Sequence, residues 1–208
     1  MEIRPALPGF DGVNRFVDKS KNVVIAKVLP GEFYVTRHDE MVATVLGSCI
    51  AACLWDDDNN VGGMNHFMLP LQNTHVSDSW SSDNGYACRY GNWAMEYLIN
   101  EILKHGAVRR NLKAKVFGGG KIMSGGASDV GEGNIDFVIE YLHNENIDIV
   151  TQDTGGIYPR KVMFHPLSGR VFMKALQSLH NNTIEQRERE YKQNIEVKPA
   201  DSGDIELF

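Results

Sequence analysis

The feature that most constrains the fold is the run from Met41 to Trp55, 15 residues without a charged side chain. Gly47 and Ser48 divide this run into two apolar segments, 42–46 and 50–55, which we predict to be strands. A helix that crosses a bilayer needs about 20 apolar residues, so the run is too short to insert in a membrane. A polar cluster, 56–60, follows, and the chain is apolar again over 61–69. This order predicts a β-hairpin.

Other strands and two helices are predicted along the chain. Short apolar segments bounded by turn residues predict strands at 33–36, 114–117 and 147–151, and a second hairpin formed by 161–165 and 170–174. Apolar residues at helical spacing predict helices over 92–105 and 134–143, each with an asparagine as its N-cap, Asn92 and Asn134. Because helices and strands alternate only in part, we predict a layered α/β fold with a mixed β-sheet.

Three parts of different composition are expected. Residues 1–30 contain several prolines and glycines and are predicted to form an N-terminal extension with one short strand, Val23–Val28. Residues 31–178 are predicted to form a single compact domain that includes a polar loop, 72–84. Residues 179–208 are poor in apolar side chains, and 183–208 contain seven acidic and four basic residues. We therefore expect a polar surface helix followed by a disordered tail.

Charge and cysteine content exclude several classes of protein. The 208-residue chain has a formal net charge of −6, which disfavours sequence-independent nucleic-acid binding, since such binding depends on lysine and arginine. The first 15 residues lack the basic-then-apolar pattern of a secretory signal. The three cysteines, Cys49, Cys53 and Cys88, form no CxxC pair or zinc framework. We expect a cytoplasmic protein with free thiols.

The first hairpin also places a cysteine and a histidine in related positions. A nucleophilic cysteine needs a base to remove its proton, and histidine is the usual one. If the hairpin loop is 56–59, Cys49 lies directly opposite His66; if the loop is 57–60, the two are diagonal on the same face. A three- or five-residue loop would separate them on opposite faces. Backbone N–H groups around Ser48–Ile50 are candidates to stabilise an oxyanion.

Each highlighted residue also has a purely structural interpretation. A cysteine is often only a small buried apolar residue, which is the expected role of Cys53. Cys88 is expected in a loop and without a role. The glycines at 118–120 lack phosphate-loop spacing and are interpreted as a tight turn that lines the site. A structural role is expected for His165 and core positions for Trp93 and Tyr97, whereas Arg160 could face either substrate or solvent.

Several motifs in this order resemble the chemoreceptor glutamine deamidases of the CheD family. The first two are LGSCIAACLWD, which starts at Leu46, and GMNHFMLP, which starts at Gly63. They are followed by RYGNWAME from Arg89, KVFGG from Lys115, NIDF from Asn134 and DTGGIYPRKV from Asp153. The resemblance covers roughly residues 31–175 without large gaps. It implies a single-domain three-layer α/β sandwich, like that of the necrotizing-factor deamidase toxins.

The resemblance also implies an activity and the residues that perform it. The activity is hydrolysis of selected glutamine side-chain amides on the cytoplasmic domain of methyl-accepting chemotaxis receptors, with no metal or organic cofactor. The family's nucleophile corresponds to Cys49 and its histidine to His66. The family's threonine, six residues before the cysteine, corresponds to Ala43, so Thr44 is the candidate third member. A backbone carbonyl that orients His66 is the alternative.

Two other functions are compatible with the same residues. CheD-like proteins are also associated with a CheC-type phosphatase, which could occupy the same cleft, so the chain could act as its binding or regulatory partner. A thiol peptidase or a receptor methylesterase would need only a different acyl substrate.

Overall fold

Two five-stranded sheets pack face to face in the computed structural model, which describes residues 2–69, 82–122, 129–177 and 182–197. The first sheet has the order β1 (Asn14–Asp18), β2 (Val23–Lys27), β4 (Met41–Leu46), β9 (Arg160–His165), β10 (Arg170–Ala175). The second has the order β3 (Phe33–Thr36), β6 (Val61–Asn65), β5 (Ile50–Asp56), β7 (Lys113–Gly118), β8 (Asp148–Thr154).

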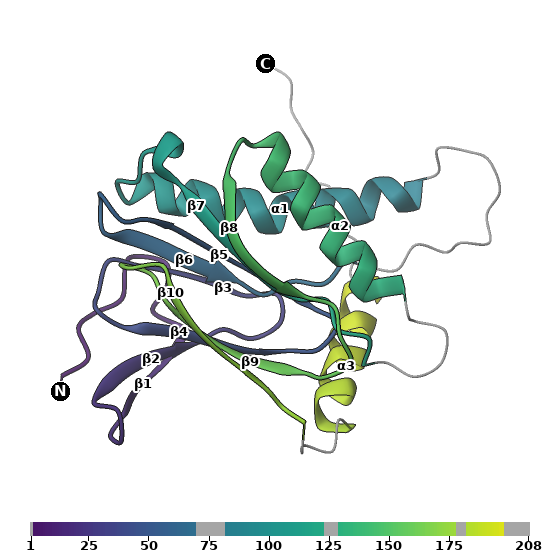
Figure 1. Ribbon diagram of the computed structural model, residues 1–208, viewed down its shortest axis with the longest axis horizontal. Coiled ribbons are helices and arrows are strands. Elements are labelled where there is room, and N and C mark those ends of the chain that lie inside the picture. Colours follow the sequence, from purple (N-terminus) through teal and green to yellow (C-terminus); the bar gives the residue numbers. More distant parts are fainter. Residues whose placement is uncertain (1, 70–81, 123–128, 178–181, 198–208) are drawn as a thin grey trace.

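Helices form the third layer. α1 (Ser82–Lys104) and α2 (Asp129–Asn144) cover the outer face of the second sheet, and a short 3-10 turn, Arg109–Asn111, precedes β7 (Figure 1). α3 (Asn182–Val197) lies across one end of the sandwich instead of on a face. Both sheets are mixed, because β2 pairs with β4 and β7 with β8 in parallel while the other pairs are antiparallel. The predicted single-domain three-layer α/β sandwich is confirmed, with two mixed sheets where one was expected.

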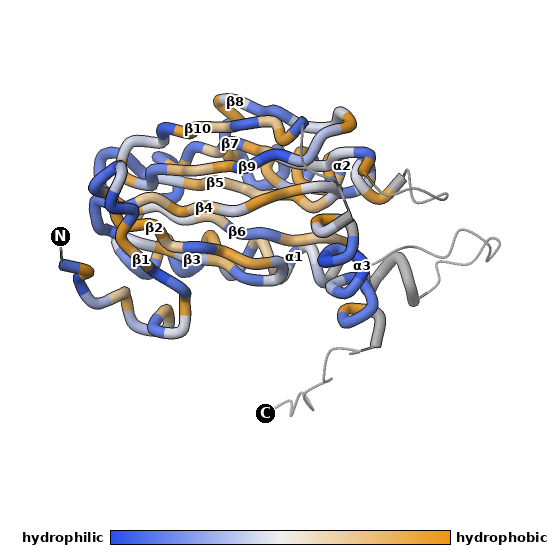
Figure 2. Tube along the Cα trace, turned by 90° about the horizontal axis from the view of Figure 1, so that it is seen from below, coloured by the Kyte–Doolittle hydropathy of each residue, from blue (hydrophilic) through white to orange (hydrophobic). Residues whose placement is uncertain are grey.

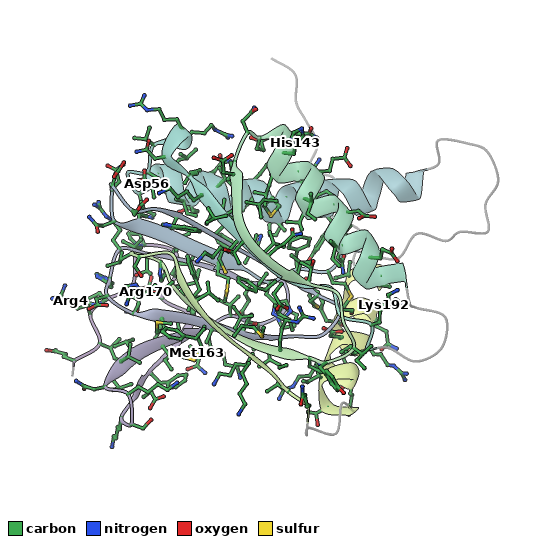
Figure 3. The ribbon with its side chains drawn as sticks, in the orientation of Figure 1. Arg4, Asp56, His143, Met163, Arg170 and Lys192 are labelled. Atoms are coloured by element: carbon green, nitrogen blue, oxygen red, sulfur yellow. The ribbon has the colours of Figure 1, made fainter. Side chains whose placement is uncertain are left out.

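The central strand β5 shows why the 41–55 run is uncharged. All seven of its residues are buried, since the first sheet covers one face and the helices cover the other. Strands buried on both faces have continuous apolar sequences without alternation. Side chains from the two sheets fill the layer between them (Figure 3), whereas α3 is mainly hydrophilic (Figure 2).

Both helices of the outer layer begin earlier than predicted. α1 starts at Ser82, so Asn92 lies inside the helix and residues 82–84 of the predicted polar loop are helical; residues 72–81 of that loop lie outside the described part. α2 starts at Asp129, and Asn134 is a buried residue within it. In both cases the first turns are polar or glycine-rich, so the apolar side chains at helical spacing begin only later in the helix.

No described helix is long and apolar enough to cross a membrane.

Two predicted core residues are on the surface. Trp93 and Tyr97 are 46% and 47% exposed, because they lie on the side of α1 that faces away from the sheet. Their rings contact each other, with Tyr90 and Phe33 at the two ends of the group. Helical spacing alone does not distinguish such an exposed aromatic stripe from a core face.

The N-terminal strands are joined to the sandwich by a buried ion pair. Arg15 of β1 contacts the Glu40 carboxylate at 2.8 Å, and both side chains are at most 9% exposed. The hydroxyls of Tyr34 and Thr36 donate to the other oxygen of Glu40, at 2.8 and 2.6 Å. β2 also pairs with β4, so residues 14–27 are part of the first sheet.

Removal of Arg15 tests how firmly this segment is held. Arg15→Ala leaves the Glu40 carboxylate buried without its cation, which we expect to cost about 3–5 kcal/mol of unfolding free energy. Urea denaturation followed by tryptophan fluorescence measures the change. Lys19→Ala, at an exposed position between β1 and β2, is the control and should stay within about 0.5 kcal/mol of the wild type. Equal stability of the two variants would contradict the structural role of the pair.

Candidate active site

The register of the first hairpin places Cys49 and His66 on one face. Cys53 lies opposite Met64 in the β5–β6 pair, and a bridge between Ile50 and Phe67 continues the same register. The loop is therefore 57–60, the second of the two predicted registers. In this register Cys49 and His66 are diagonal neighbours on the same side of the sheet.

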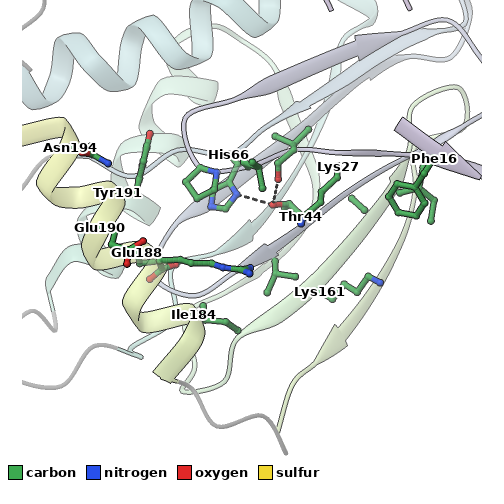
Figure 4. A pocket seen from close by; sticks show the side chains of 17 residues that line it. Phe16, Lys27, Thr44, His66, Lys161, Ile184, Glu188, Glu190, Tyr191 and Asn194 are labelled. Carbon is green, nitrogen blue, oxygen red and sulfur yellow. Dashed lines mark hydrogen bonds between the residues drawn. The ribbon is translucent and has the colours of Figure 1, made fainter. Parts of the chain in front are cut away.

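His66 is oriented by Thr44. The Thr44 hydroxyl donates to the Val28 carbonyl oxygen at 2.8 Å and lies 2.7 Å from Nδ1 of His66 (Figure 4). With its proton directed to Val28, the hydroxyl can accept a hydrogen bond from Nδ1, which assigns the Nδ1-protonated tautomer to His66. Nε2 is then the unprotonated nitrogen. It is buried and has no hydrogen-bond partner among the described residues, so it is free to accept a proton.

Strand geometry explains why Thr44, and not Ala43, makes this contact. Successive side chains of β4 point to opposite faces. Ala43 packs with Ile25, Met41 and Met163 in a small cluster separate from the main core. Thr44 points to the other side, toward His66. Both predicted orienting groups are present. The Val28 carbonyl oxygen fixes the Thr44 hydroxyl, and this hydroxyl in turn fixes the His66 imidazole.

Three successive backbone N–H groups, those of Gly47, Ser48 and Cys49, point toward one position. The carbonyl oxygen of each of these residues accepts a hydrogen bond from a neighbouring segment of the chain. Gly120 N–H donates to Gly47 O at 2.7 Å, and Gly119 N–H donates to Cys49 O at 2.9 Å. Asn134 Nδ2 donates to Ser48 O at 2.9 Å. The Gly47 and Ser48 carbonyls lie in the peptide planes that carry the Ser48 and Cys49 N–H groups, so these contacts fix the direction of both amides. The three N–H groups form a concave site for an anion, here called the amide nest.

The glycines behind the nest allow this close packing. Gly118 has φ +118, and a Cβ on it would lie 2.0 Å from the Cys49 carbonyl oxygen. A Cβ on Gly47 would lie 1.9 Å from the Ile122 side chain. The structure thus agrees with the interpretation of 118–120 as a turn beside the site. The Ile50 N–H, by contrast, donates to the Phe67 carbonyl at 2.9 Å and is not part of the nest, so the predicted donor range is shifted by one residue.

The nest is occupied by Glu188 of α3. Its carboxylate accepts hydrogen bonds from the N–H groups of Gly47 (2.9 Å), Ser48 (3.0 Å) and Cys49 (3.3 Å), and from the Ser48 hydroxyl (2.7 Å). Glu188 is only 2% exposed. It was not predicted as a site residue, because it lies 139 positions from Cys49 in a polar segment.

Burial controls the protonation of the two reactive groups. Burial raises the pKa of the Cys49 thiol well above its ordinary value, and the negative charge of the neighbouring Glu188 carboxylate raises it further. Burial also lowers the pKa of His66 to about 3. Both groups are therefore neutral near pH 7. A neutral imidazole is the form that can accept a proton from the thiol.

A pocket of about 780 Å³ opens beside these groups between the first sheet and α3. Figure 4 shows His66 and Thr44 on one wall and Glu188 and Tyr191 on the other. Lys27 and Lys161 also line it. In the described part of the chain no group of three His, Cys, Asp or Glu side chains could hold a metal ion.

The remaining predicted residues lie away from this chemistry. Cys53 is buried in the core, as expected. His165 contacts Asp39 and Ser168, in agreement with a structural role. Arg160 faces neither substrate nor solvent, because it is buried and contacts Asp153 and the Gly155 carbonyl. Cys88 belongs to α1, not to a loop, and its side chain lies outside the described part.

Known proteins match nearly the whole length of the chain. The family model for CheD chemotactic sensory transduction matches residues 68–175. A Methylobacillus flagellatus protein named "Probable chemoreceptor glutamine deamidase CheD" is 48% identical, over 94% of this chain and 95% of its own length. Proteins of the same name from Halorhodospira halophila and Hydrogenovibrio crunogenus are each 47% identical, over 97% and 94% of this chain and 93% and 100% of their own lengths. This chain belongs to the CheD family.

Proposed function

We propose that this protein hydrolyses glutamine side-chain amides of chemoreceptors to glutamate, with Cys49 as nucleophile and His66 as base. The observation that carries the proposal is the amide nest at Cys49, a residue on the same face of the hairpin as His66, whose Nε2 is buried and has no partner in the described part of the chain. A thiol, a base and an oxyanion site are the three groups that acyl transfer requires. The names of the relatives supply the receptor as substrate.

The mechanism proceeds through a thioester. Nε2 of His66 removes the thiol proton, and Sγ of Cys49 attacks the side-chain carbonyl carbon of the glutamine. The carbonyl oxygen becomes negative and is held by the N–H groups of the nest. The C–N bond breaks, and His66 gives the proton to the departing ammonia. A water molecule, deprotonated by His66, then hydrolyses the thioester and leaves glutamate and the free thiol.

The nest is suited to this substrate because it already holds the carboxylate of a glutamate side chain. One oxygen of that carboxylate is in the position expected for the amide oxygen of a glutamine. Donors placed this way are most valuable when the oxygen becomes charged, and each is typically worth about 3–4 kcal/mol of barrier.

The cellular setting follows from the substrate. Chemoreceptor glutamines are presented on the receptor's cytoplasmic domain, so we place the protein in the cytoplasm. A CheC-type phosphatase is a second proposed partner, which would bind in the same cleft. Cys49→Ala should retain binding to such a partner although it loses deamidation, since the thiol is needed only for chemistry.

Removal of either reactive group should abolish the activity. Cys49→Ala and His66→Ala are each expected to lower the rate at least about 10³-fold, because nucleophile and base act as one unit. The deamidation rate is measured by intact-mass analysis of a purified receptor cytoplasmic segment, since deamidation adds about one dalton per glutamine. A mass loss of one methylene would indicate ester cleavage, and chain fragments would indicate proteolysis. Full activity in either variant would refute the mechanism.

Thr44 is a positioning residue, and its loss should be milder. Thr44→Val removes the acceptor of the Nδ1 proton, so the imidazole no longer has a preferred tautomer. We expect kcat to fall about 10- to 100-fold, with little change in KM. Thr44→Ser keeps the hydroxyl and should restore most of the rate. If Thr44→Ser is as impaired as Thr44→Val, the methyl group and not the hydroxyl matters, and the tautomer argument is wrong.

A further inference from the structure

α3 has one face that contacts the rest of the protein. Ile184, Glu188, Tyr191 and Ile195 are spaced by four, three and four residues, which places them on one side of a helix. Ile195 is 7% exposed, and Ile184 lines the pocket. The carboxylate of Glu188 is thus the charged group in an otherwise apolar or aromatic stripe.

Tyr191 holds the helix near the site, one turn after Glu188. Its hydroxyl contacts the hydroxyl of Tyr90 on α1. Its ring packs against the backbone at Gly31, where a Cβ would lie 2.9 Å from the ring. The contact therefore depends on a glycine between β2 and β3. α3 is thus anchored after Glu188 by Tyr191 and by the buried Ile195.

Burial of a carboxylate costs several kcal/mol unless hydrogen bonds replace its water. Hydrogen bonds from four donors offset this cost for Glu188, and all four donors belong to residues 47–49. No described cation pairs with it in the nest. One of these donors is the backbone N–H of Cys49 itself, at 3.3 Å. The side chain is therefore a glutamate held by the oxyanion donors next to the nucleophile, which is the chemical form of the product.

We propose that α3 is a tethered product mimic, which occupies the substrate groove with Glu188 in the position of the product glutamate and must leave before a substrate can enter. The inference rests on the proposed deamidase function. It implies that the groove accepts a glutamine carried on one face of a helix, with apolar or aromatic residues four positions before it and three and seven after it.

The tether makes α3 an effective competitor. β10 ends at Ala175 and α3 begins at Asn182, so a short link joins the helix to the sandwich. A short link gives a bound segment an effective concentration in the millimolar range. To reach Cys49, a free substrate must therefore outcompete the tethered α3 for the groove, or bind α3 at another surface and draw it away. The occupied state also keeps the thiol protonated, because a carboxylate lies against it.

The sharpest test converts the mimic into a substrate. In Glu188→Gln the amide of residue 188 replaces the carboxylate in the nest. Sγ of Cys49 should attack its side-chain carbon, ammonia should leave with the thiol proton, and water should hydrolyse the thioester to regenerate glutamate. We expect the purified variant to gain about one dalton, with peptide mapping showing glutamate at position 188.

Matched variants define the controls. Glu190→Gln makes the same change at an exposed position of the same helix and should keep its glutamine. The natural Gln186 and Gln193, also exposed, should remain glutamine in every preparation. Cys49→Ala combined with Glu188→Gln should retain the amide introduced at position 188. The Glu188→Gln variant could keep its introduced amide and still deamidate a receptor segment. That result would refute the product-mimic role of α3 and leave the proposed deamidase function intact. If neither the introduced amide nor the receptor glutamines react, the proposed function fails, and the mimic with it.

Release of α3 is the second test. Glu188→Ala removes the anchor, so we expect the deamidation rate on a receptor segment to rise at least about tenfold. Alkylation of Cys49 by iodoacetamide should accelerate by a similar factor. Gln193→Ala, at an exposed position of the same helix, should behave as the wild type. A folded Glu188→Ala variant, judged by circular dichroism, that is no faster than the wild type in both assays would overturn the proposal.

Discussion

The site depends on the orientation of three peptide planes, those that carry the N–H groups of Gly47, Ser48 and Cys49. The Ser48 and Cys49 N–H groups share their peptide planes with the Gly47 and Ser48 carbonyls, which accept hydrogen bonds from Gly120 N–H and Asn134 Nδ2, so these two amides cannot turn away. Gly119 N–H fixes the next plane, through the Cys49 carbonyl. Each of these contacts comes from the end of β7 or from α2. The end of β7 and α2 therefore act as a frame that fixes residues 47–49, the link between β4 and β5. Preorganised donors of this kind need no reorganisation during the reaction, which is why they lower a barrier effectively.

Local sequence predicted the parts of the site that local geometry controls. The hairpin residues 56–60 limited the register to a few choices, and the correct one places Cys49 and His66 on one face. The family position corresponds to Ala43 and Thr44 was the candidate beside it; the alternation of β4 explains why Thr44 is the one of the two that faces His66. The fold class followed from the mixture of short apolar strands and two helices, although the start of each helix was missed where its first turns are polar.

Other parts of the site are formed by long-range contacts, which the periodicity of the sequence does not reveal. Asn134 was interpreted as a helix cap because asparagine is a common cap, yet it is buried inside α2, where its amide joins Ser48 O and Leu69 N–H. Glu188 belongs to a segment with many charges, so it had the appearance of a solvated residue. The available signal was the spacing of Ile184, Tyr191 and Ile195 around it, which indicates a helix face that needs a partner. Sequence could not show that the partner is the amide nest.

The buried, neutral state of the site and the placement of Glu188 have a common physical basis. Burial makes the charged form of Cys49 or His66 costly, so proton transfer between them must be compensated by the nest and by entry of the substrate. A carboxylate in the nest does the opposite, because its negative charge opposes formation of a thiolate beside it. A neutral amide in the same position leaves the donors free to stabilise the charge that develops on its oxygen. In the proposed mechanism the nest binds both the substrate and the product of one reaction, and only the charge of the occupant distinguishes a site ready for chemistry from a closed one.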